Sequence, residues 1–285
     1  MKTWLITGVS SGFGRAIADA ALAAGDRVVG TLRNDEQRKA FAALTPGRSF
    51  GVVLDVTDEA KIEPTVDRIE REVGPIDVLV NNAGYGHEGT LEESTLGDLR
   101  RQFEVNVFGA VAMAKAVLPH MRKRRSGHIV NITSMGGLIT LPGLSFYHGS
   151  KFALEGLSEA LGKEVKDFGI HVTAVEPGSF RTDWAGRSMN RAPRGIEDYD
   201  SLMNPIREKR LAMSGKQIGN PAKLGEAVVK LVNSDNPPAH LLLGSDAIKL
   251  VDRKLAELRA EYDAWKDLSL STDFVDDTGA GNSWA

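Results

Sequence analysis

The segment TGVSSGFGRAIADAAL, residues 7–22, sets three glycines between a short apolar run and a helical pattern. Gly8 permits a tight turn, Gly12 lets the backbone approach a pyrophosphate, and Gly14 lets the following helix pack close to the sheet. A glycine-rich turn can also do no more than begin a helix. Its position at the first strand-to-helix junction favours a dinucleotide site, with phosphates facing the amides of the helix. The residues expected to contact the cofactor here are Gly8, Ser10, Ser11, Gly12, Phe13 and Gly14.

Apolar or β-branched runs alternate with longer helical patterns along most of the chain. This alternation predicts βαβ units, and near-continuous apolar runs are typical of strands that helices cover on both faces. The expected strands span residues 3–7, 27–32, 49–55, 76–81, 128–133, 171–176 and 240–243, and the expected helices begin near Gly12, Asp35, Asp58, Thr95, Tyr147 and Pro221. We therefore predict an α/β fold: a doubly wound parallel sheet of the Rossmann type with about seven strands, helices on both faces and a single domain.

Two regions depart from this alternation. Residues 180–219 show no clear period and are expected to form a substrate loop, because a long insertion in a compact domain is usually functional. Residues 269–285 are rich in Asp, Ser, Thr and Gly, and are expected to form a polar extension beyond a dinucleotide-binding and catalytic domain of residues 1–268. A long helix near residues 246–265 precedes that extension.

The composition excludes several classes of function. A hydrophobic fraction of 42%, a charged fraction of 26% and a net charge of −3 are typical of a soluble protein with no general attraction to nucleic acid or membranes. The chain has no cysteine, which excludes disulfides and thiol catalysis. The early apolar run at 20–24 is too short for a signal peptide, so the cytoplasm is the expected location.

Two other patterns receive ordinary structural interpretations. The basic run RKRR, residues 122–125, is interpreted as a solvated helix end rather than a nucleic-acid contact. The six histidines are scattered, so no metal site is expected and a zinc-dependent alcohol dehydrogenase is disfavoured.

Further polar residues follow the predicted strands. The segment NNAG, residues 81–84, follows the fourth strand, and Ser134 follows the fifth at the edge where open α/β sheets bind ligands. Tyr147 and Lys151 lie four residues apart, on one face of a predicted helix. Asn106 has poor helix propensity within a helical pattern, so it requires a tertiary reason.

In order and approximate spacing, these motifs resemble those of the short-chain dehydrogenase/reductase family, from about Thr3 to Thr182. TGVSSGFG and the residues near Arg33 are similar to its single-domain branch with hydroxysteroid and retinol dehydrogenase-like members. The resemblance implies hydride transfer between a nicotinamide and a carbonyl or alcohol. Beyond the glycine turn, it implies cofactor contacts by Asp55, Asn82, Ala83, Gly84, Pro177, Gly178 and Thr182.

The resemblance also implies catalytic roles for Asn106, Ser134, Tyr147 and Lys151. Tyr147 would act as general acid or base, and a free phenol has a pKa of about 10, too high for an efficient base at neutral pH. Lys151 is expected to lower that pKa through its charge, and Ser134 to hydrogen-bond the substrate oxygen. Asn106 would hold a water that links Lys151 to solvent.

The end of the second strand favours NADP(H), with NAD(H) as the alternative. No acid stands at residues 30–32 to bind the ribose hydroxyls, and Arg33 follows at once, where it could pair with a 2′-phosphate. Asp35 and Glu36 lie slightly downstream, and their other interpretation is as caps of the next helix.

The substrate is expected to be a hydrophobic ketone, aldehyde or secondary alcohol. Tyr85, His87 and residues 184–213 would give a largely apolar pocket mouth, whereas His148 is expected to face the surface. A hypothesis from another class is a non-catalytic NADP(H)-binding redox sensor, which would need only the glycine turn and Arg33. By resemblance, a homodimer or homotetramer would form through helices near residues 99–125 and 147–168.

Overall fold

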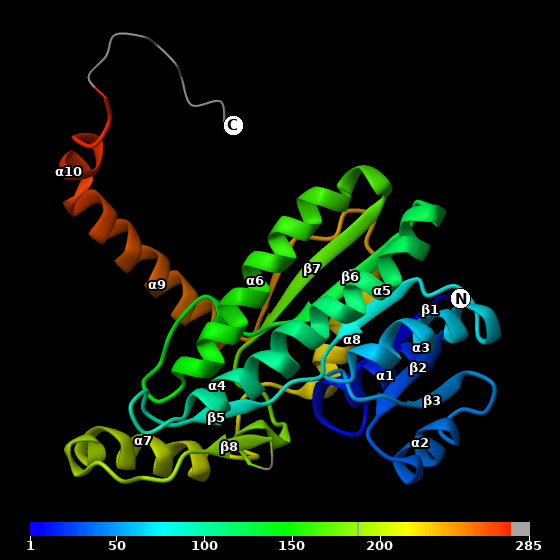
Figure 1. The fold of residues 1–285 in the computed structure, drawn as a ribbon, viewed down its shortest axis with the longest axis horizontal. Helices are drawn as coiled ribbons and strands as arrows, with labels where there is room; N and C mark the ends of the chain where they lie inside the picture. The colour runs from blue at the N-terminus through cyan, green and yellow to red at the C-terminus, as the bar shows by residue number, and fades with distance from the viewer. Residues whose placement is uncertain (187, 275–285) are drawn as a thin grey trace.

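The computed structural model describes residues 1–186 and 188–274 of the chain and shows a parallel sheet between two layers of helices (Figure 1). Seven strands pair in the order β3-β2-β1-β4-β6-β7-β9, every pair parallel. The strands are β1 (Thr3–Ile6), β2 (Arg27–Leu32), β3 (Ser49–Val53), β4 (Val78–Asn81), β6 (Gly127–Ile132), β7 (Ile170–Pro177) and β9 (His240–Leu243). The predicted doubly wound sheet is confirmed.

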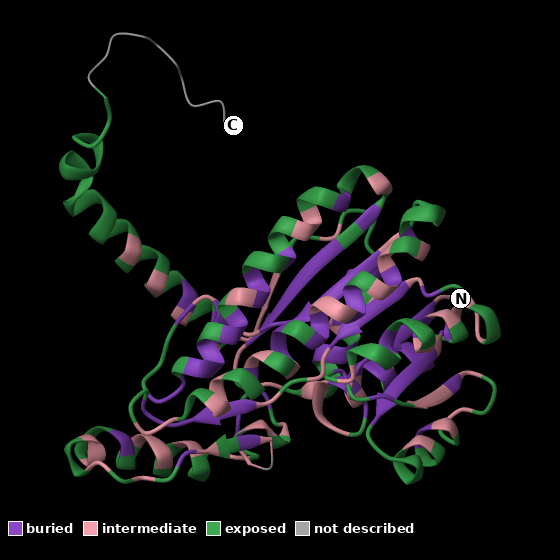
Figure 2. Cartoon of the chain, viewed as in Figure 1, coloured by how far each residue is buried: buried purple, intermediate pink, exposed green. Residues whose placement is uncertain are grey.

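Successive side chains of each strand point to opposite faces of the sheet and pack into two apolar cores. Trp4 and Ile6 of β1 pack on one face with helices α1 and α8, and Leu5 packs on the other with α3 and α5. Figure 2 shows the sheet buried between these helical layers. The α-helices of the domain are α1 (Gly12–Ala23), α2 (Asp35–Ala42), α3 (Glu59–Glu72), α4 (Leu96–Phe103), α5 (Gly109–Arg124), α6 (Ser145–Val165), α7 (Asp200–Ala212) and α8 (Pro221–Val232).

The strand order fixes where a ligand can bind. After β3 at one edge of the sheet, the chain returns to place β4 on the other side of β1. The order therefore reverses between β1 and β4, and the loops that follow these two strands diverge at the carboxyl edge of the sheet. Ligands of open α/β sheets bind in the crevice that such a reversal opens.

The structure differs from the sequence prediction in the segment 180–219. A three-residue strand β8 (Met189–Arg191) pairs with β5 (Gly86–Glu88), and α7 follows. Of the α7 residues only Met203 is buried, so the helix has no apolar stripe to reveal it in the sequence. The described residues of the segment thus include regular structure that the sequence did not reveal, and the expected role of the segment as a substrate loop remains a prediction.

The carboxyl end departs from the compact domain. Helix α9 (Ser245–Ala264) projects away from the sheet, and a short helix, α10 (Lys266–Leu270), follows it (Figure 1). The polar extension is predicted to begin at residue 269, but this residue lies within α10. Residues 275–285 of the predicted extension lie outside the described residues. Among the described residues no helix combines the length and apolar character needed to cross a membrane.

Candidate active site

The glycine turn has the backbone shape that the sequence predicts. Gly8 and Gly12 adopt positive φ angles of 73° and 60°, which favour glycine. A Cβ atom at Gly14 would overlap the Gly8 carbonyl oxygen and the side-chain amide of Asn82. The first turn of α1 therefore lies against the end of β1, and a side chain larger than hydrogen is excluded at position 14.

The N-terminus of α1 is open toward a second loop. Ser11 is the N-cap residue, yet its side chain makes no capping hydrogen bond, whereas Asn34, Thr95 and Asn220 cap α2, α4 and α8. A Cβ atom at Gly12 would meet Thr182 no closer than 3.9 Å. Uncapped amides beside a glycine and a threonine fit the phosphates of a dinucleotide, since amides and the positive end of a helix attract anions.

Asn82 and Ala83 brace this turn. The side-chain amide of Asn82 donates to the carbonyl oxygens of Thr7 (2.8 Å) and Gly8 (3.0 Å). The Thr7 hydroxyl oxygen accepts from the backbone amides of Asn82 and Ala83, at 2.9 Å each. The NNAG segment thus shapes the glycine turn, and Gly84 lies where a Cβ atom would be 3.1 Å from Asn106 Oδ1.

The loop after β7 completes the crevice. Phe13 and Phe180 meet edge to face with ring centroids 5.3 Å apart, which joins this loop to α1. Gly178, which follows Pro177, donates its amide to the Leu243 carbonyl at 2.8 Å. A Cβ atom there would overlap Asp246 Oδ1, and Asp246 Oδ2 accepts from the Ser179 amide at 2.8 Å. The start of α9 therefore holds the loop in place.

The residues after β2 and β3 lie at the same edge of the sheet. Arg33 follows β2 directly and is exposed. Asp55, two residues beyond β3, is exposed and accepts from the amide (3.0 Å) and hydroxyl (2.8 Å) of Thr57. Asp35 was the other candidate to cap α2, but the N-cap residue is Asn34, whose side chain accepts from the Gln37 amide, and Asp35 instead pairs with Arg38 and Lys39 in the first turn.

Three of the four predicted catalytic residues meet beyond the carboxyl end of β6. Ser134 lies two residues past the strand and caps a short 3₁₀ turn, Met135–Gly137, by accepting from the Gly136 amide at 2.9 Å. Tyr147 lies in the first turn of α6 and is hydrogen-bonded to the Ser134 side chain. Lys151, one turn later, donates from Nζ to the Ile132 carbonyl at 2.8 Å, and Nζ lies 5.9 Å from the centroid of the Tyr147 ring.

Burial controls the charge of this pair. It raises the pKa of Tyr147 to about 12, although the hydrogen bond with Ser134 acts to lower it. The same desolvation lowers the pKa of Lys151 to about 8. Desolvation dominates the phenol here, and the expected lowering of the phenol pKa by Lys151 remains a prediction. At neutral pH the Tyr147 phenol holds its proton and can donate it.

Asn106 has a structural reason for its position in a helix. It lies in a π-helical turn, Glu104–Phe108, between α4 and α5. Its side chain accepts from the Tyr85 amide and donates to the Tyr85 carbonyl and to Ser150 Oγ, each at 3.1 Å. Asn106 thus ties the segment after β4 to α6, and π-turns of this kind are frequent at functional sites. Its predicted contact with a water remains a prediction.

His148 is placed differently from the prediction. It was expected at the surface but is only 4% exposed. The Leu141 amide donates to Nε2 at 2.9 Å, so Nδ1 carries the proton and donates to the Gly136 carbonyl at 2.7 Å. Burial lowers the pKa of His148, which keeps the ring neutral. The side chain fixes the loop between Ser134 and Tyr147.

An apolar cover lies directly over the phenol. The Tyr147 and Trp184 ring centroids are 5.1 Å apart, and Leu144 and Met189 pack in the same cluster. The cover is held by Glu88, 2% exposed, whose carboxylate lies 3.2 to 3.5 Å from side-chain nitrogens of Arg191, Arg207 and Arg210. No local sequence pattern marks Glu88, because its arginine partners lie about 100 residues away along the chain.

A second cluster, in which two buried carboxylates meet an exposed imidazole, lies one turn of α6 beyond Lys151. His240 Nδ1 is 2.8 Å from Glu176 Oε1 and 3.5 Å from Glu155 Oε2. Burial raises the pKa of Glu155 to about 7 and also raises that of Glu176, while the two carboxylates raise the pKa of His240. Carboxylate and imidazole atoms of all three lie within 4.8 Å, although the sequence suggested no such grouping. A proton on the imidazole would balance part of the negative charge of the two buried carboxylates.

Comparison with known proteins agrees with this arrangement. A family model described as short chain dehydrogenase matches residues 2–192. The chain is 40% identical over 272 residues to "Oxidoreductase BOA17" of Botryotinia fuckeliana, covering 95% of this chain and 99% of that protein. It is 41% identical over 242 residues to the 3-ketodihydrosphingosine reductase of Bacteroides thetaiotaomicron, covering 84% and 87%.

Solved structures give the same result. A short-chain dehydrogenase from Streptomyces avermitilis superposes with a TM-score of 0.88 at 42% identity, covering 96% of this chain and 98% of that one. A serine dehydrogenase complexed with NADP⁺ superposes with a TM-score of 0.74 at 26% identity, covering 85% and 94%. The family match, the relatives and the geometry agree: this chain belongs to the short-chain dehydrogenase family of oxidoreductases.

Proposed function

We propose that the protein interconverts a hydrophobic ketone or aldehyde and its alcohol, using NADP(H) and Tyr147 as the general acid or base. The observation that carries the proposal is the grouping of Ser134, Tyr147 and Lys151 at the sheet edge that also holds the glycine turn. A cofactor crevice and a proton donor are thus adjacent. That combination suits hydride transfer coupled to proton transfer.

The glycine turn, the α1 N-terminus and Thr182 would hold the pyrophosphate of the cofactor. Arg33 would select NADP(H) by pairing with the 2′-phosphate, and the exposure of this side chain directly after β2 supports that role. Asp55 would contact the adenine. When bound, the nicotinamide would supply or accept the hydride. The NADP⁺ complex of a related fold supports this choice of cofactor.

In the reducing direction, Tyr147 would donate its phenolic proton to the substrate oxygen as charge develops there. Ser134 would donate a hydrogen bond to the same oxygen and so stabilise that charge. The ammonium of Lys151 would then stabilise the phenolate, and its pKa of about 8 suits it to return a proton near neutral pH. In the oxidising direction the phenolate would take the proton from the alcohol.

The apolar cover supports a hydrophobic substrate. Trp184, Leu144 and Met189 surround the Tyr147 ring, so a substrate that reaches the phenol would displace apolar contacts rather than water. A relative that is named for reduction of a long-chain keto compound supports the same class. We infer that a substrate with an extended alkyl or aromatic portion adjoining the carbonyl binds best.

The test is oxidation of NADPH and, in parallel, NADH, followed by absorbance against matched ketones that differ only in alkyl chain length. We expect turnover with NADPH, faster than with NADH, and a value of kcat/KM that rises with chain length. Tight NADPH binding without turnover of aliphatic, aromatic, steroidal or retinoid carbonyls would contradict the proposal and support the redox sensor instead.

A further inference from the structure

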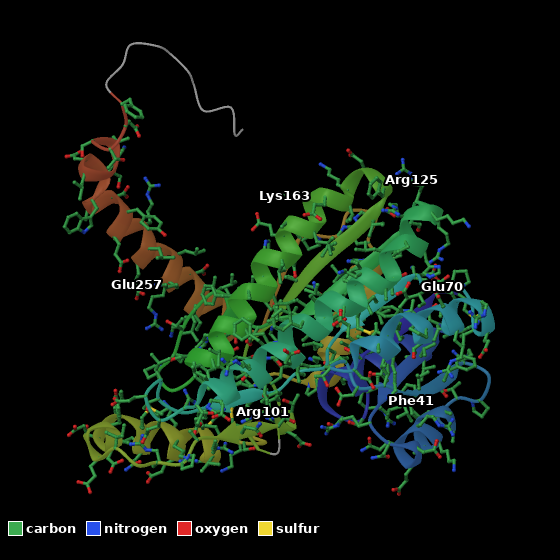
Figure 3. The ribbon with its side chains drawn as sticks, viewed as in Figure 1. Phe41, Glu70, Arg101, Arg125, Lys163 and Glu257 are labelled. Atoms are coloured by element: carbon green, nitrogen blue, oxygen red, sulfur yellow. The ribbon has the colours of Figure 1, made fainter. Side chains whose placement is uncertain are left out.

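Helix α9 leaves the domain soon after it begins. Ala247 and Val251 are buried against the body, but residues 252–264 are exposed or only partly covered. Figure 1 shows the helix extending away from β9, and Figure 3 shows Glu257 on this projecting part, well away from the sheet. Most helical stability in proteins comes from packing an apolar face, and the outer part of α9 has no such packing within the described residues.

The outer part nevertheless carries an apolar seam. Apolar residues recur at spacings of three, four, three, four and three, an alternation typical of the a and d positions of a coiled coil. Four of them are strongly exposed: Ile248 at 50%, Leu255 at 59%, Tyr262 at 66% and Trp265 at 66%. The repeat runs through Ile248, Val251, Leu255, Leu258, Tyr262 and Trp265. Val251 is only 7% exposed and packs against the domain, so the other five residues form the seam. An exposed seam of this length marks an interaction surface.

The charges beside the seam indicate what covers it. Acidic and basic residues are interleaved along α9, unlike the lysine- and arginine-rich polar face of helices that bind anionic membranes. The remaining carboxyl segment, VDDTGAGNSWA at 275–285, has no apolar repeat to complement the five seam residues. A second helix with the same repeat is the matching partner, and a second copy of this chain provides one.

The flanking residues also favour one direction of pairing. In an antiparallel pair centred between Leu255 and Leu258, Asp252 of each copy would face Arg259 of the other, and Lys254 would face Glu261. Two-fold symmetry makes each attractive pair occur twice. In a parallel pair Lys254 would instead face Arg259, and like charges repel.

Side-chain sizes agree with the antiparallel register. Antiparallel coiled coils set an a residue of one helix against a d residue of the other. Trp265 would then meet Ile248 of the other copy, so a large aromatic side chain packs against a smaller aliphatic one, and Leu255 would meet Leu258. We propose that α9 pairs with α9 of a second copy of this chain as an antiparallel two-helix seam.

The test is the mass of the full chain in solution, measured by light scattering and sedimentation across micromolar concentrations. Leu255→Glu places a charge in the seam and is expected to halve the assembly mass. Ala260→Glu adds the same charge on the opposite side of α9 and is expected to leave it unchanged. Both positions are exposed, so neither substitution disturbs the domain core, and equal thermal unfolding would verify this.

Charge reversal tests the direction of pairing. Asp252→Arg should weaken association at least tenfold, because it would face Arg259, and adding Arg259→Asp should restore it. A mass that is the same for the original chain, Leu255→Glu and Ala260→Glu would overturn the proposal, as would failure of the double reversal to restore association. Turnover is measured separately and is expected to survive Leu255→Glu, so this result and that of the proposed activity are distinguishable.

Discussion

The nucleotide side and the cover side of the crevice are built by different means. On the nucleotide side, backbone shape dominates: Gly8, Gly14 and Asn82 lock a turn whose residues lie within two short segments. On the cover side, one buried carboxylate, Glu88, gathers arginines from β8 and α7. The glycine turn is rigid because no side chain fits at Gly14, whereas the cover depends on ion pairs of Glu88 that can separate. We therefore expect changes on the two sides to affect different steps.

The largest effect is expected at Gly14. Gly14→Ala forces its new Cβ atom onto backbone of the glycine turn, so we expect loss of cofactor affinity of at least about 100-fold and about 2–3 kcal/mol of stability. Gly156→Ala in α6 is the control, since no atom lies within 4 Å of the new Cβ. Calorimetric NADPH titration and urea unfolding measure both, and an unchanged dissociation constant for Gly14→Ala would break the comparison.

The cover should respond in substrate use rather than cofactor binding. Glu88→Gln leaves three partly buried arginines without their carboxylate, and we expect about 2 kcal/mol lower stability and an increase in KM for substrate. The NADPH dissociation constant should change less than about twofold. Glu208→Gln, on the exposed side of α7, is the matched control. A Glu88 variant that binds NADPH poorly but retains its KM would contradict a division between the two sides.

On the nucleotide side, Arg33 should control the preference for NADPH over NADH. Arg33→Asp repels a 2′-phosphate, so NADPH affinity should fall about tenfold or more while NADH affinity holds or rises. Arg33→Lys keeps the charge but loses the bidentate geometry, and an intermediate preference is expected. An unchanged ratio of kcat/KM for the two cofactors would remove Arg33 from this role.

The smallest effect is expected in the cluster of Glu155, Glu176 and His240, as a change in the pH dependence of stability. The folded-state pKa of Glu155, about 7, lies above its usual value of 4.5. Between these two pH values the folded protein keeps a proton on Glu155 that the unfolded chain loses, so the free energy of unfolding falls as the pH rises. The raised pKa of His240 acts in the same direction.

Glu155→Gln should therefore flatten the fall in stability between pH 5 and 7 by about 0.5 kcal/mol per pH unit, because Glu176 and His240 share the charge change. Urea unfolding across that range measures the slope. Glu164→Gln on the exposed side of α6 should leave the slope as it is. Parallel slopes for the original chain and Glu155→Gln would rule out Glu155 as the titrating group.

The sequence predicts what short-range spacing determines. The strands, the glycine turn and the Tyr147 and Lys151 pair follow from patterns within a few residues, and the structure brings them to one edge of the sheet. The cover does not follow, since α7 has one buried residue and Glu88 meets its arginines only after folding. His148 was misplaced for a related reason: its partners, Gly136 and Leu141, belong to a loop without a repeating pattern.

The pKa of the phenol also escaped prediction. Spacing indicates that a lysine is near, but the extent of burial appears only when Trp184, Leu144 and Met189 close over the ring. Desolvation then acts on both members of the pair, raising the pKa of Tyr147 and lowering that of Lys151.

The central claim, that Tyr147 transfers the proton, is tested most directly by Tyr147→Phe in a single-turnover assay with NADPH binding measured in the same samples. The account predicts a rate reduced by about 10²- to 10⁴-fold with a nearly unchanged NADPH dissociation constant, because only the hydroxyl is removed. Tyr262→Phe, which removes an exposed hydroxyl on α9, should match the original protein. A Tyr147→Phe rate close to that of the original protein would contradict the account.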